Sequence, residues 1–529
     1  MSETRHDVVI LGGGLAGLCL ALQLRQRFPG IAVCVLERRS HPLPLAAHKV
    51  GESSVEIGAH YFDTVLGLGE HLRKEHIYKF GFRFFYSEGR EDLPNVTELG
   101  VRRVMPRPTY QLDRGVLENH LGEEVRRAGM DFLDGAIVRS VDMAGGNADH
   151  VVTYDYAGQR HVAKARWVVD AAGRANILKR KFDLAESNGH DANSVWFRID
   201  DKLEIDQWCT DERWRRECSP PERWRSTNHL CGPGYWVWLI PLGSGAHSVG
   251  IVCDAKMHPL ETMNTFDKAM EWLKTYQPLV WRECDRRRHK LLDFKFLRDF
   301  SHSCKQVFSG DRWAITGEAG VFLDPFYSPG NDFIGISNTY ICALIEHDRK
   351  GDPVGAYAKF YQQLYFSFYE STMSLYRDQY ALFGDAEVMS TKVIWDYAYY
   401  WGVLCQIVFQ NRLTDLRLFA DLRAELESVR ELNLGMQAFF RRWAALNPPA
   451  NQAVMLDQGE LPWFRELNAT LHDPLDDNSV RVRIRGNVDM LRNLAAGIVA
   501  QAQQDCPAIE GLAGTGDAEA TPLLFEFAA

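Results

Sequence analysis

The sequence lacks several features that would place it in particular protein classes. It has no run of roughly 18 apolar residues, so no membrane-spanning helix is predicted. Its formal net charge of −10 is the opposite of the basic excess that nucleic-acid binders use, so we expect no nucleic-acid partner. The opening MSETRHDVVI has no charged leader with an apolar core, and no secretion signal is inferred.

The cysteines also lack an organised pattern. The 11 cysteines are scattered, and no two of them form a CxxC pair, so neither a zinc site nor a thioredoxin-like motif is predicted. Several lie in apolar runs, where a free cysteine acts as a small hydrophobic residue. A reducing cytoplasm is therefore the expected location.

The composition that is present is that of a globular protein. The 529 residues are 46% hydrophobic and 25% charged, which is far too apolar for a disordered chain. The length indicates several domains, or one large enzyme fold with insertions.

The first forty residues predict a strand–helix–strand unit. Residues 7–12 form a short apolar run that leads into glycines, residues 15–28 read as a helix, and residues 31–37 read as a second strand. The expected elements that follow are a helix at 55–75, β-like stretches within 80–111 and 150–170, a helix at 114–128, and a hairpin turn at 145–147.

The middle of the chain predicts further strands, and its end predicts helices. The expected strands are 194–199, 235–241, 247–253 and 312–316, with a long loop at 208–225 and a helix from about residue 333. Residues 353–503 are helical in pattern and rich in aromatics, and residues 504–529 are expected to form a loose tail. The aromatics of 355–411 indicate packing on more than one helix face, or the walls of a channel for an elongated apolar substrate.

A dinucleotide-binding fingerprint lies in the strand–helix–strand unit. Gly12, Gly14 and Gly17 form G-x-G-x-x-G, in which the glycines allow a tight turn, close approach to a pyrophosphate and close helix–sheet packing. The helix N-terminus offers free N–H groups to the phosphates, and Glu37 ends the second strand, where an acid binds ribose hydroxyls. Further expected cofactor contacts in this unit are Ala16 and Arg38.

Three later segments favour FAD over NAD. They are residues 168–174 (VVDAAGR), residues 317–325 (GEAGVFLDP) and Arg114. In order and spacing they resemble the FAD-contacting stretches of the flavoprotein monooxygenase superfamily. This resemblance implies FAD contacts by Asp170, Gly173 and Pro325, and a ribityl contact by Glu318, where the superfamily has Asp.

Four further segments carry a second resemblance: residues 49–53 (KVGES), 79–86 (KFGFRFFY), 234–241 (GYWVWLIP) and 324–330 (DPFYSPG). They are similar to segments of the tryptophan-halogenase-like family of flavin-dependent halogenases. The resemblance implies flavin contacts by Lys49, Glu52, Ser53, Gly330 and Asn331, a catalytic role for Lys79, and a halide and flavin turn at Ser328.

Each of these residues also has a structural interpretation. Lys79 can be a solvated surface lysine, although its phenylalanine neighbours argue for burial. Trp236 and Trp238 can be ordinary packing positions on one strand face, since side chains alternate with period two. Ser328 can simply close a turn.

The sequence departs from the family at two positions of the same turn. Tyr327 stands where tryptophan-type halogenases have Glu, which favours an activated phenol or pyrrole as substrate over an indole. Pro329 has no backbone N–H to offer a halide, so Gly330 and Asn331 would have to supply it. An FAD-dependent aromatic hydroxylase that uses no halide is therefore the main alternative.

The resemblance implies an enzyme of secondary metabolism. Reduced FAD would react with O₂ to give a C4a-hydroperoxide, a halide would attack it, and Lys79 would hold the hypohalous acid by a hydrogen bond or as an N-haloamine. A lysine at the reference pKa of about 10.4 is mostly ammonium, so haloamine formation would need burial. Further alternatives are a geranylgeranyl-reductase-like oxidoreductase and an inactive flavin-binding scaffold.

The expected partners follow from the same resemblance. The stretch DAAGR lacks an adjacent Asp-Gly, and no second G-x-G-x-x-G is present, which favours a two-component system with a separate flavin reductase. The small aromatic substrate would be free or tethered to a carrier protein.

The predicted fold is α/β (α+β), with a Rossmann-like FAD-binding domain, an inserted antiparallel sheet and a helical C-terminal part. The expected divisions are residues 1–185 with 300–350 for the FAD-binding domain, with a β insertion near 80–111, then 186–299 for the sheet domain, 351–503 for the helical region and 504–529 for the tail.

Overall fold

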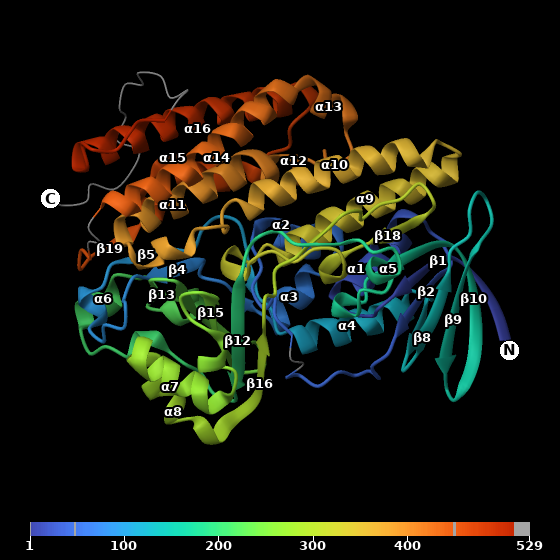
Figure 1. Ribbon diagram of the computed structural model, residues 1–529, viewed down its shortest axis with the longest axis horizontal. Helices are drawn as coiled ribbons and strands as arrows, with labels where there is room; N and C mark the ends of the chain where they lie inside the picture. The colour runs from blue at the N-terminus through green and yellow to red at the C-terminus, as the bar shows by residue number, and fades with distance from the viewer. Residues whose placement is uncertain (1, 47–48, 448–450, 513–529) are drawn as a thin grey trace. The chain divides into compact units, whose positions relative to one another are not determined.

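A computed structural model of the protein describes residues 2–46, 49–447 and 451–512. The chain groups into two compact units, and each is described by itself (Figure 1). The first unit comprises residues 1–76, 112–189 and 301–369, and the second comprises residues 77–111, 190–300 and 370–529. The mixed α/β class predicted from the sequence is confirmed. The finer division into four parts stays a prediction.

A seven-stranded sheet forms the centre of the first unit. Its strand order is β7-β2-β1-β10-β9-β8, with β18 also paired to β10. The β7, β2, β1, β10 and β18 pairings are parallel, and β8, β9 and the start of β10 pair antiparallel. The strands are β1 (Ser2–Leu11), β2 (Val33–Glu37), β7 (Asp131–Asp134), β8 (Ile137–Asp142), β9 (His150–Tyr156), β10 (Gln159–Asp170) and β18 (Trp313–Ile315), with a separate pair of β11 (Ala185–Glu186) and β17 (Ser303–Cys304).

Helices accompany this sheet, and α1 is buried on most sides because it contacts both α4 and α9. The N-terminal strand–helix–strand unit, the helix expected at 114–128 and the turn at 145–147 are confirmed. The helices are α1 (Leu15–Arg27), α2 (Glu56–His60), α3 (Gly69–Glu75), α4 (Arg114–Arg127), α5 (Ile177–Lys181), α9 (Gly330–Lys350) and α10 (Val354–Met373), whose residues up to 369 belong to this unit.

Three details of the first unit differ from the sequence-based expectation. Strand β1 begins at Ser2 rather than residue 7, because its parallel pairing with β10 extends to Ser2 opposite His161. The helix expected at 55–75 is divided into α2, a π-helical turn (Tyr61–Val65) and α3. Helix α9 begins at Gly330, before the expected residue 333.

An eight-stranded sheet organises the second unit. Its order is β16-β12-β15-β14-β13-β4-β5-β19, and its pairings are antiparallel except for β4 with β13 and β5 with β19. The strands are β4 (Phe82–Phe85), β5 (Glu98–Gly100), β12 (Ala192–Ile199), β13 (Thr227–Gly232), β14 (Tyr235–Pro241), β15 (His247–Asp254), β16 (Leu291–Leu297) and β19 (Met455–Asp457), with a separate pair of β3 (Ile77–Tyr78) and β6 (Tyr110–Gln111).

One face of this sheet carries an apolar core that α7 and α8 cover. These two helices were not predicted. The loop expected at 208–225 is wrong in part, because it contains α6 and a 3₁₀ turn (Arg223–Arg225). The helices of the unit are α6 (Glu212–Arg216), α7 (Phe266–Tyr276), α8 (Pro278–Asp285), α11 (Ala386–Tyr399), α12 (Gln406–Phe409), α13 (Leu416–Asp421), α14 (Arg423–Leu446), α15 (Pro462–Ala469) and α16 (Asp477–Asp505).

The C-terminal residues are helical as predicted, except for the short strand β19. Helix α11 is buried along nearly its whole length, and α14 and α16 lie side by side (Figure 1). The tail expected from residue 504 begins only after α16, which continues to Asp505. The last residues of the expected tail, 513–529, lie outside the described residues.

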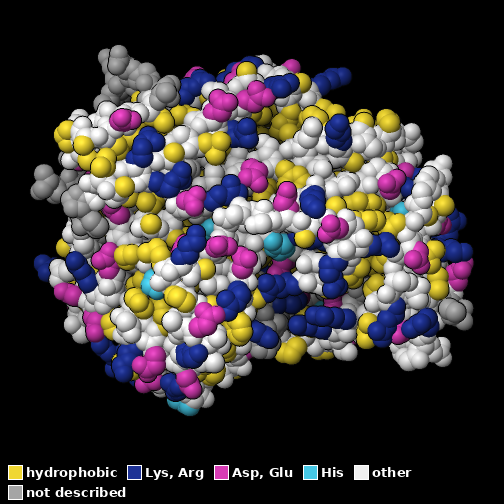
Figure 2. All heavy atoms as spheres, in the orientation of Figure 1, with side chains coloured by type: hydrophobic (Ala, Val, Ile, Leu, Met, Phe, Trp, Pro, Cys, Tyr) yellow, Lys and Arg dark blue, Asp and Glu magenta, His cyan; other side chains and the backbone are white. Residues whose placement is uncertain are grey.

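The surface carries charges of both signs. On the face drawn in Figure 2, acidic and basic side chains are interspersed, and a group of Lys and Arg side chains lies near its lower centre. Within the described ranges, no helix has the length and apolar character that crossing a membrane requires. All eleven cysteines are free thiols.

Candidate active site

The glycine turn between β1 and α1 packs tightly against the end of β10. Gly12 has φ of +111°, and a Cβ there would lie 2.5 Å from the carbonyl oxygen of Ala171. A Cβ on Gly17 would overlap the carbonyl oxygen of Gly12. No side chain caps the N-terminus of α1, where Ala16 lies buried in the first turn. The first N–H groups of α1 therefore remain available for phosphate oxygens.

Glu37 at the end of β2 borders the same turn. One carboxylate oxygen accepts a hydrogen bond from the Gly13 N–H (2.8 Å), and the other accepts one from the Arg39 N–H (2.8 Å). Each oxygen has a second lone pair, so the carboxylate can still accept a hydrogen bond from a ribose hydroxyl. The neighbouring Arg38 is exposed.

A charged cluster of Lys49, Arg114 and Glu118 lies beside the glycine turn. Arg114 Nη2 donates to the buried Glu118 carboxylate (2.6 Å), Lys49 Nζ pairs with its other oxygen, and a Cβ on Gly14 would be 3.8 Å from Lys49 Nζ. Burial alone would raise the pKa of Glu118, but Arg114 and Lys49 outweigh it and hold that pKa below its usual range. The cluster carries a net positive charge that suits a pyrophosphate.

The segment 49–53 is fixed on both sides. Arg114 Nη1 donates to the Val50 carbonyl (2.6 Å), and the Glu52 carbonyl accepts the Leu112 N–H (2.6 Å). The Ser53 carbonyl accepts from Asn331 Nδ2 at the start of α9 (3.1 Å). The first unit thus brings three predicted cofactor segments together.

Asp170 shapes the turn after β10. Its buried carboxylate accepts the backbone N–H groups of Ala172 (3.0 Å) and Leu178 (2.7 Å), and burial raises its pKa to about 6. A Cβ on Gly173 in this turn would lie 3.8 Å from Glu318 Oε2. Asp170 therefore holds the turn through backbone contacts, whereas Gly173 borders the Glu318 side chain.

Glu318 pairs with an arginine of the same turn. The Arg174 Nε lies 3.2 Å from the Glu318 carboxylate. Burial raises the pKa of Glu318, and the Arg174 guanidinium opposes that rise. This carboxylate remains partly accessible and can accept a hydrogen bond from a ligand hydroxyl.

The turn at 325–331 leads directly into α9. Pro325 and Tyr327 bound a 3₁₀ turn, Ser328 has a left-handed φ of 54°, and Pro329 occupies the N-cap position of α9. Since the 21-residue α9 begins at Gly330, the N–H groups of Gly330 and Asn331 have no acceptor within the helix. These N–H groups lie at the positive end of the helix dipole, next to a proline that has no N–H of its own.

Lys79 belongs to the second unit and lies at an aromatic cluster. Its side chain is 2% exposed, and its Nζ lies 3.4 Å from the centroid of the Phe82 ring. Beside Phe82 the rings of Phe84 and His229 stack at 4.7 Å. The burial of Lys79 excludes the interpretation as a solvated surface lysine.

The two tryptophans of β14 share the sheet face opposite the apolar core. Tyr235, which alternates with them along the strand, belongs to the core that α7 and α8 cover. Trp236 Nε1 donates to the Tyr380 hydroxyl (3.1 Å), and the Trp236 ring lies 5.2 Å from the ring of His229. Trp236 therefore packs into the aromatic cluster rather than into the covered core.

Several residues of these sites were not predicted. Glu118 could have been found, because it lies one helical turn after Arg114, where opposite charges pair. His229 carries no signal in the sequence, because its neighbours Phe82 and Phe84 are distant along the chain. Tyr380 and Tyr397, whose ring is 6.2 Å from that of Phe82, belong to the aromatic stretch 355–411, where packing or a channel wall was expected.

The donor set of the first unit fits FAD. It combines uncapped helix N–H groups, a cationic pair for phosphates and carboxylates for ribose and ribityl hydroxyls. A family model described as FAD binding domain matches residues 5–268. FAD is therefore the cofactor, and the role of each single residue stays a prediction.

The known proteins similar to this chain include flavin-dependent halogenases. The flavin-dependent halogenase chlA of Dictyostelium discoideum is 26% identical over 81% of this chain and 78% of its own. A chlorinase of 1H-pyrrole-2-carbonyl-peptidyl-carrier protein from Pseudomonas fluorescens is 26% identical over 62% and 73%. The crystal structure of halogenase PltM in complex with phloroglucinol and FAD aligns with a TM-score of 0.64 at 16% identity, over 95% and 97%.

Gly17→Ala is expected to weaken FAD binding. The added methyl group must push α1 away from the Gly12 carbonyl, and overpacking of about 1–3 kcal/mol corresponds to roughly 5- to 150-fold weaker binding. Quenching of flavin fluorescence measures the affinity. The control is Gly355→Ala, where the nearest atom to an added Cβ is 4.0 Å away. Equal affinity in both variants and the wild type would contradict the close approach.

Glu118→Gln is expected to destabilise the protein in a pH-dependent way. At pH 7 it leaves Lys49 and Arg114 without their shared anion, which costs about 3–5 kcal/mol in the free energy of unfolding. Because the folded-state pKa of Glu118 is lowered, its contribution is present above about pH 4.3 and is lost as the pH falls below that value.

Urea unfolding at pH 7 and at lower pH checks this expectation. The difference in the free energy of unfolding between wild type and variant should become smaller on acidification. A difference independent of pH would refute the assignment of Glu118 as the ionised partner of Lys49 and Arg114. Glu123→Gln, an exposed position of the same helix, should behave as the wild type at both pH values.

Proposed function

We propose that this chain, which belongs to the flavin-dependent halogenase family, halogenates an electron-rich aromatic ring of the phenol or pyrrole type. The observation that carries the proposal is the buried Lys79, whose ammonium group lies against the Phe82 ring inside an aromatic cluster. A lysine is almost never buried in such surroundings without a function or a partner that requires it.

The first unit would hold FAD through its backbone and its charged cluster. The N–H groups at the start of α1, with Lys49 and Arg114, would bind the pyrophosphate, and Glu37 would bind the ribose. Glu318 would accept from the ribityl hydroxyls, while Asp170 keeps the adjacent turn in shape. Reduced FAD supplies the two electrons with which O₂ is activated to oxidise the halide.

The start of α9 is the proposed halide site. The N–H groups of Gly330 and Asn331 would bind the anion at the positive end of the helix dipole. Pro329 removes one donor from the turn, so these two carry the binding. Ser328 has a left-handed backbone conformation, which directs the chain from the 3₁₀ turn into the helix. In the sequence it lies two residues before Gly330.

Lys79 would deliver the oxidised halogen to the substrate. The Phe82 ring face attracts an ammonium group, so the contact favours a charged Lys79 that donates a hydrogen bond to hypohalous acid. Delivery as an N-haloamine would instead require a neutral amine. The surrounding aromatic side chains would limit the escape of hypohalous acid into bulk water.

The substrate class is supported by Tyr327 and by the relatives. Tyr327 stands where a carboxylate would assist halogenation of an indole, and an activated phenol or pyrrole does not need that assistance. The PltM complex contains phloroglucinol, a phenol, and the Pseudomonas relative chlorinates a pyrrole on a carrier protein. We therefore propose a free phenol or a carrier-tethered pyrrole, with a separate reductase supplying reduced FAD.

The proposal predicts a halogenated product from a defined mixture. The protein is supplied with FAD, a flavin reductase, O₂, bromide or chloride, and a panel of phenols, free pyrroles and carrier-tethered pyrroles, and products are identified by mass. A halogenated phenol or pyrrole is expected. Hydroxylated products without halogen would contradict the proposed halogenation and favour the hydroxylase alternative. That alternative is based on Pro329, which has no N–H group to bind a halide.

Lys79→Met is expected to abolish product formation while flavin reoxidation continues. The substitution keeps a similar apolar stem but removes the donor, and loss of a positioned proton donor lowers turnover by roughly 100-fold or more. Stopped-flow absorbance follows the flavin, and mass spectrometry follows the product. Lys74→Met, an exposed control with 77% of its side chain accessible, should retain activity. Full product formation by Lys79→Met would exclude Lys79 from catalysis.

A further inference from the structure

The backbone around Lys79 is held by a second chain segment, residues 222–226. The Phe80 N–H donates to the Arg225 carbonyl (3.2 Å), while the Lys79 N–H donates to the Thr109 carbonyl (2.8 Å). The peptide that carries Lys79 is therefore bonded to two different segments. Both segments belong to the second unit.

Two consecutive side chains bind the carbonyls on either side of Lys79. Arg225 donates to the Tyr78 carbonyl through Nε (3.1 Å) and Nη2 (2.9 Å). The Ser226 hydroxyl donates to the Phe80 carbonyl (3.1 Å). The Arg225 side chain thus fixes the peptide plane before Lys79, and the Phe80 N–H bond to the Arg225 carbonyl fixes the plane after it. The Ser226 bond fixes the next plane, between residues 80 and 81. Together these bonds set the direction in which the Lys79 side chain leaves the backbone.

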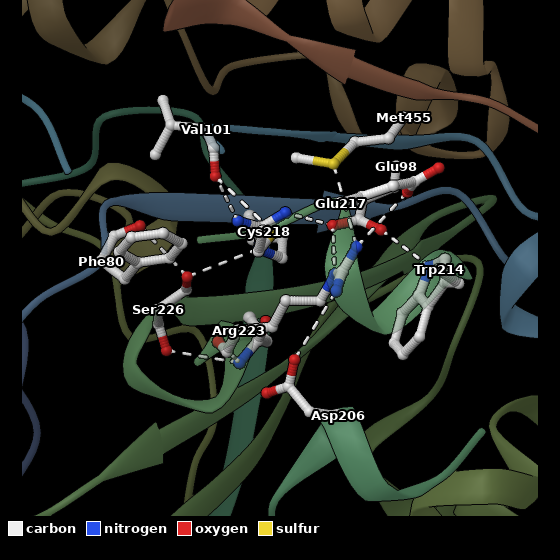
Figure 3. A network of polar contacts seen from close by, with 12 residues as sticks. Phe80, Glu98, Val101, Asp206, Trp214, Glu217, Cys218, Arg223, Ser226 and Met455 are labelled. Carbon is white, nitrogen blue, oxygen red and sulfur yellow. Dashed lines mark hydrogen bonds and ion pairs between the residues drawn. The ribbon is translucent and has the colours of Figure 1, made fainter. Parts of the chain in front are cut away.

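Segment 222–226 is itself anchored in the protein interior by Arg223. The Arg223 side chain is buried, its Nε donates to Glu98 Oε1 (2.8 Å), and Trp214 Nε1 donates to Glu98 Oε2 (3.0 Å). Figure 3 shows Arg223 between Glu98 on one side and Asp206, 3.6 Å away, on the other. Arg83 completes the network, since it pairs with Glu98 and donates to the Val101 carbonyl (2.7 Å).

The network balances charges that are costly to bury. Burial alone would raise the pKa of Glu98, but Arg83 and Arg223 outweigh it and keep the pKa below its usual range, so Glu98 is ionised. Two buried arginines face the carboxylates of Glu98 and Asp206. Buried ion pairs often stabilise a fold no better than apolar residues do, but they fix geometry.

We propose that Arg225 is a positioning residue for Lys79, and that the Glu98 network holds the segment from which Arg225 acts. This inference rests on the proposed function, because it gives a role to the geometry of Lys79. A displacement of about 1 Å at a reacting group can cost roughly 100-fold in rate. Loosening the segment would let hypohalous acid escape from Lys79 before it meets the ring.

The test measures how accessible the Lys79 amine is, which does not require activity. The full-length protein is treated with limiting acetic anhydride, and acetylation of each lysine is quantified by peptide mass spectrometry. Lys392, which is 1% exposed and paired with Asp396 in the same unit, reports global loosening. The variants are Arg225→Met, Arg225→Lys and Ser226→Ala, and Arg213→Met, with a 93% exposed side chain in the same region, is the control.

In Arg225→Met, acetylation of Lys79 should rise by about fivefold for each hydrogen bond lost, while Lys392 and the Arg213→Met protein remain unchanged. Ser226→Ala should give a smaller rise, and Arg225→Lys should partly restore protection. If Arg225→Met does not fold, the acetylation of Lys79 in Ser226→Ala decides the test. Unchanged Lys79 acetylation, or an equal rise at Lys79 and Lys392, would overturn the proposal.

A second measurement links positioning to the reaction. With a diketone that traps free hypohalous acid, the Arg225→Met protein should transfer more halogen to the trap and less to the ring, at an unchanged rate of flavin oxidation. If the ratio of halogen on the trap to halogen on the ring is the same as in the wild type, Arg225 does not act on the reaction as proposed. If the wild type halogenates no ring at all, the proposed function fails, and acetylation still decides whether Arg225 holds the Lys79 segment.

Discussion

The close approach of α1 to the ends of β1 and β10 is the constraint on which the first unit depends. Side chains at Gly12 and Gly17 would collide with the carbonyls of Ala171 and Gly12, so only glycine permits this packing. The approach leaves the first N–H groups of α1 uncapped. Glu37, Lys49 of the cluster around Glu118 and the turn after β10 then all border the same glycine turn, with donors and acceptors suited to a dinucleotide.

The second unit depends on a different constraint, which is the free-energy cost of burying the Lys79 ammonium group. Alternation along β14 separates a covered apolar core from an opposite face that carries Trp236. Lys79 lies at that aromatic cluster, where the Phe82 ring offsets part of the cost of removing an ammonium group from water. The ion network of Glu98 then fixes the backbone from which Lys79 projects.

The sequence was sufficient for features that depend on local pattern. The N-terminal strand–helix–strand unit and α4 follow from periodicity and glycine spacing, and the predicted cofactor segments lie together in the first unit as their order indicated. Helices α7 and α8 were not predicted, although α7 buries Ala269, Met270 and Leu273, which have helical spacing.

Other features could not be predicted because they depend on residues far apart in the chain. Strand β19 is recognisable only through its pairing with β5, and Glu98 meets Arg223 only after folding. Tertiary contacts, rather than composition, determine these sites.

Binding of a series of flavins tests the central claim most directly. Titration of the purified chain with FAD, FMN and riboflavin compares a ligand that contains a pyrophosphate with two that lack it. If the glycine turn and the Lys49–Arg114 pair hold that group, FAD binds one per chain and far more tightly than FMN or riboflavin. Equal affinity for the three flavins would contradict the account.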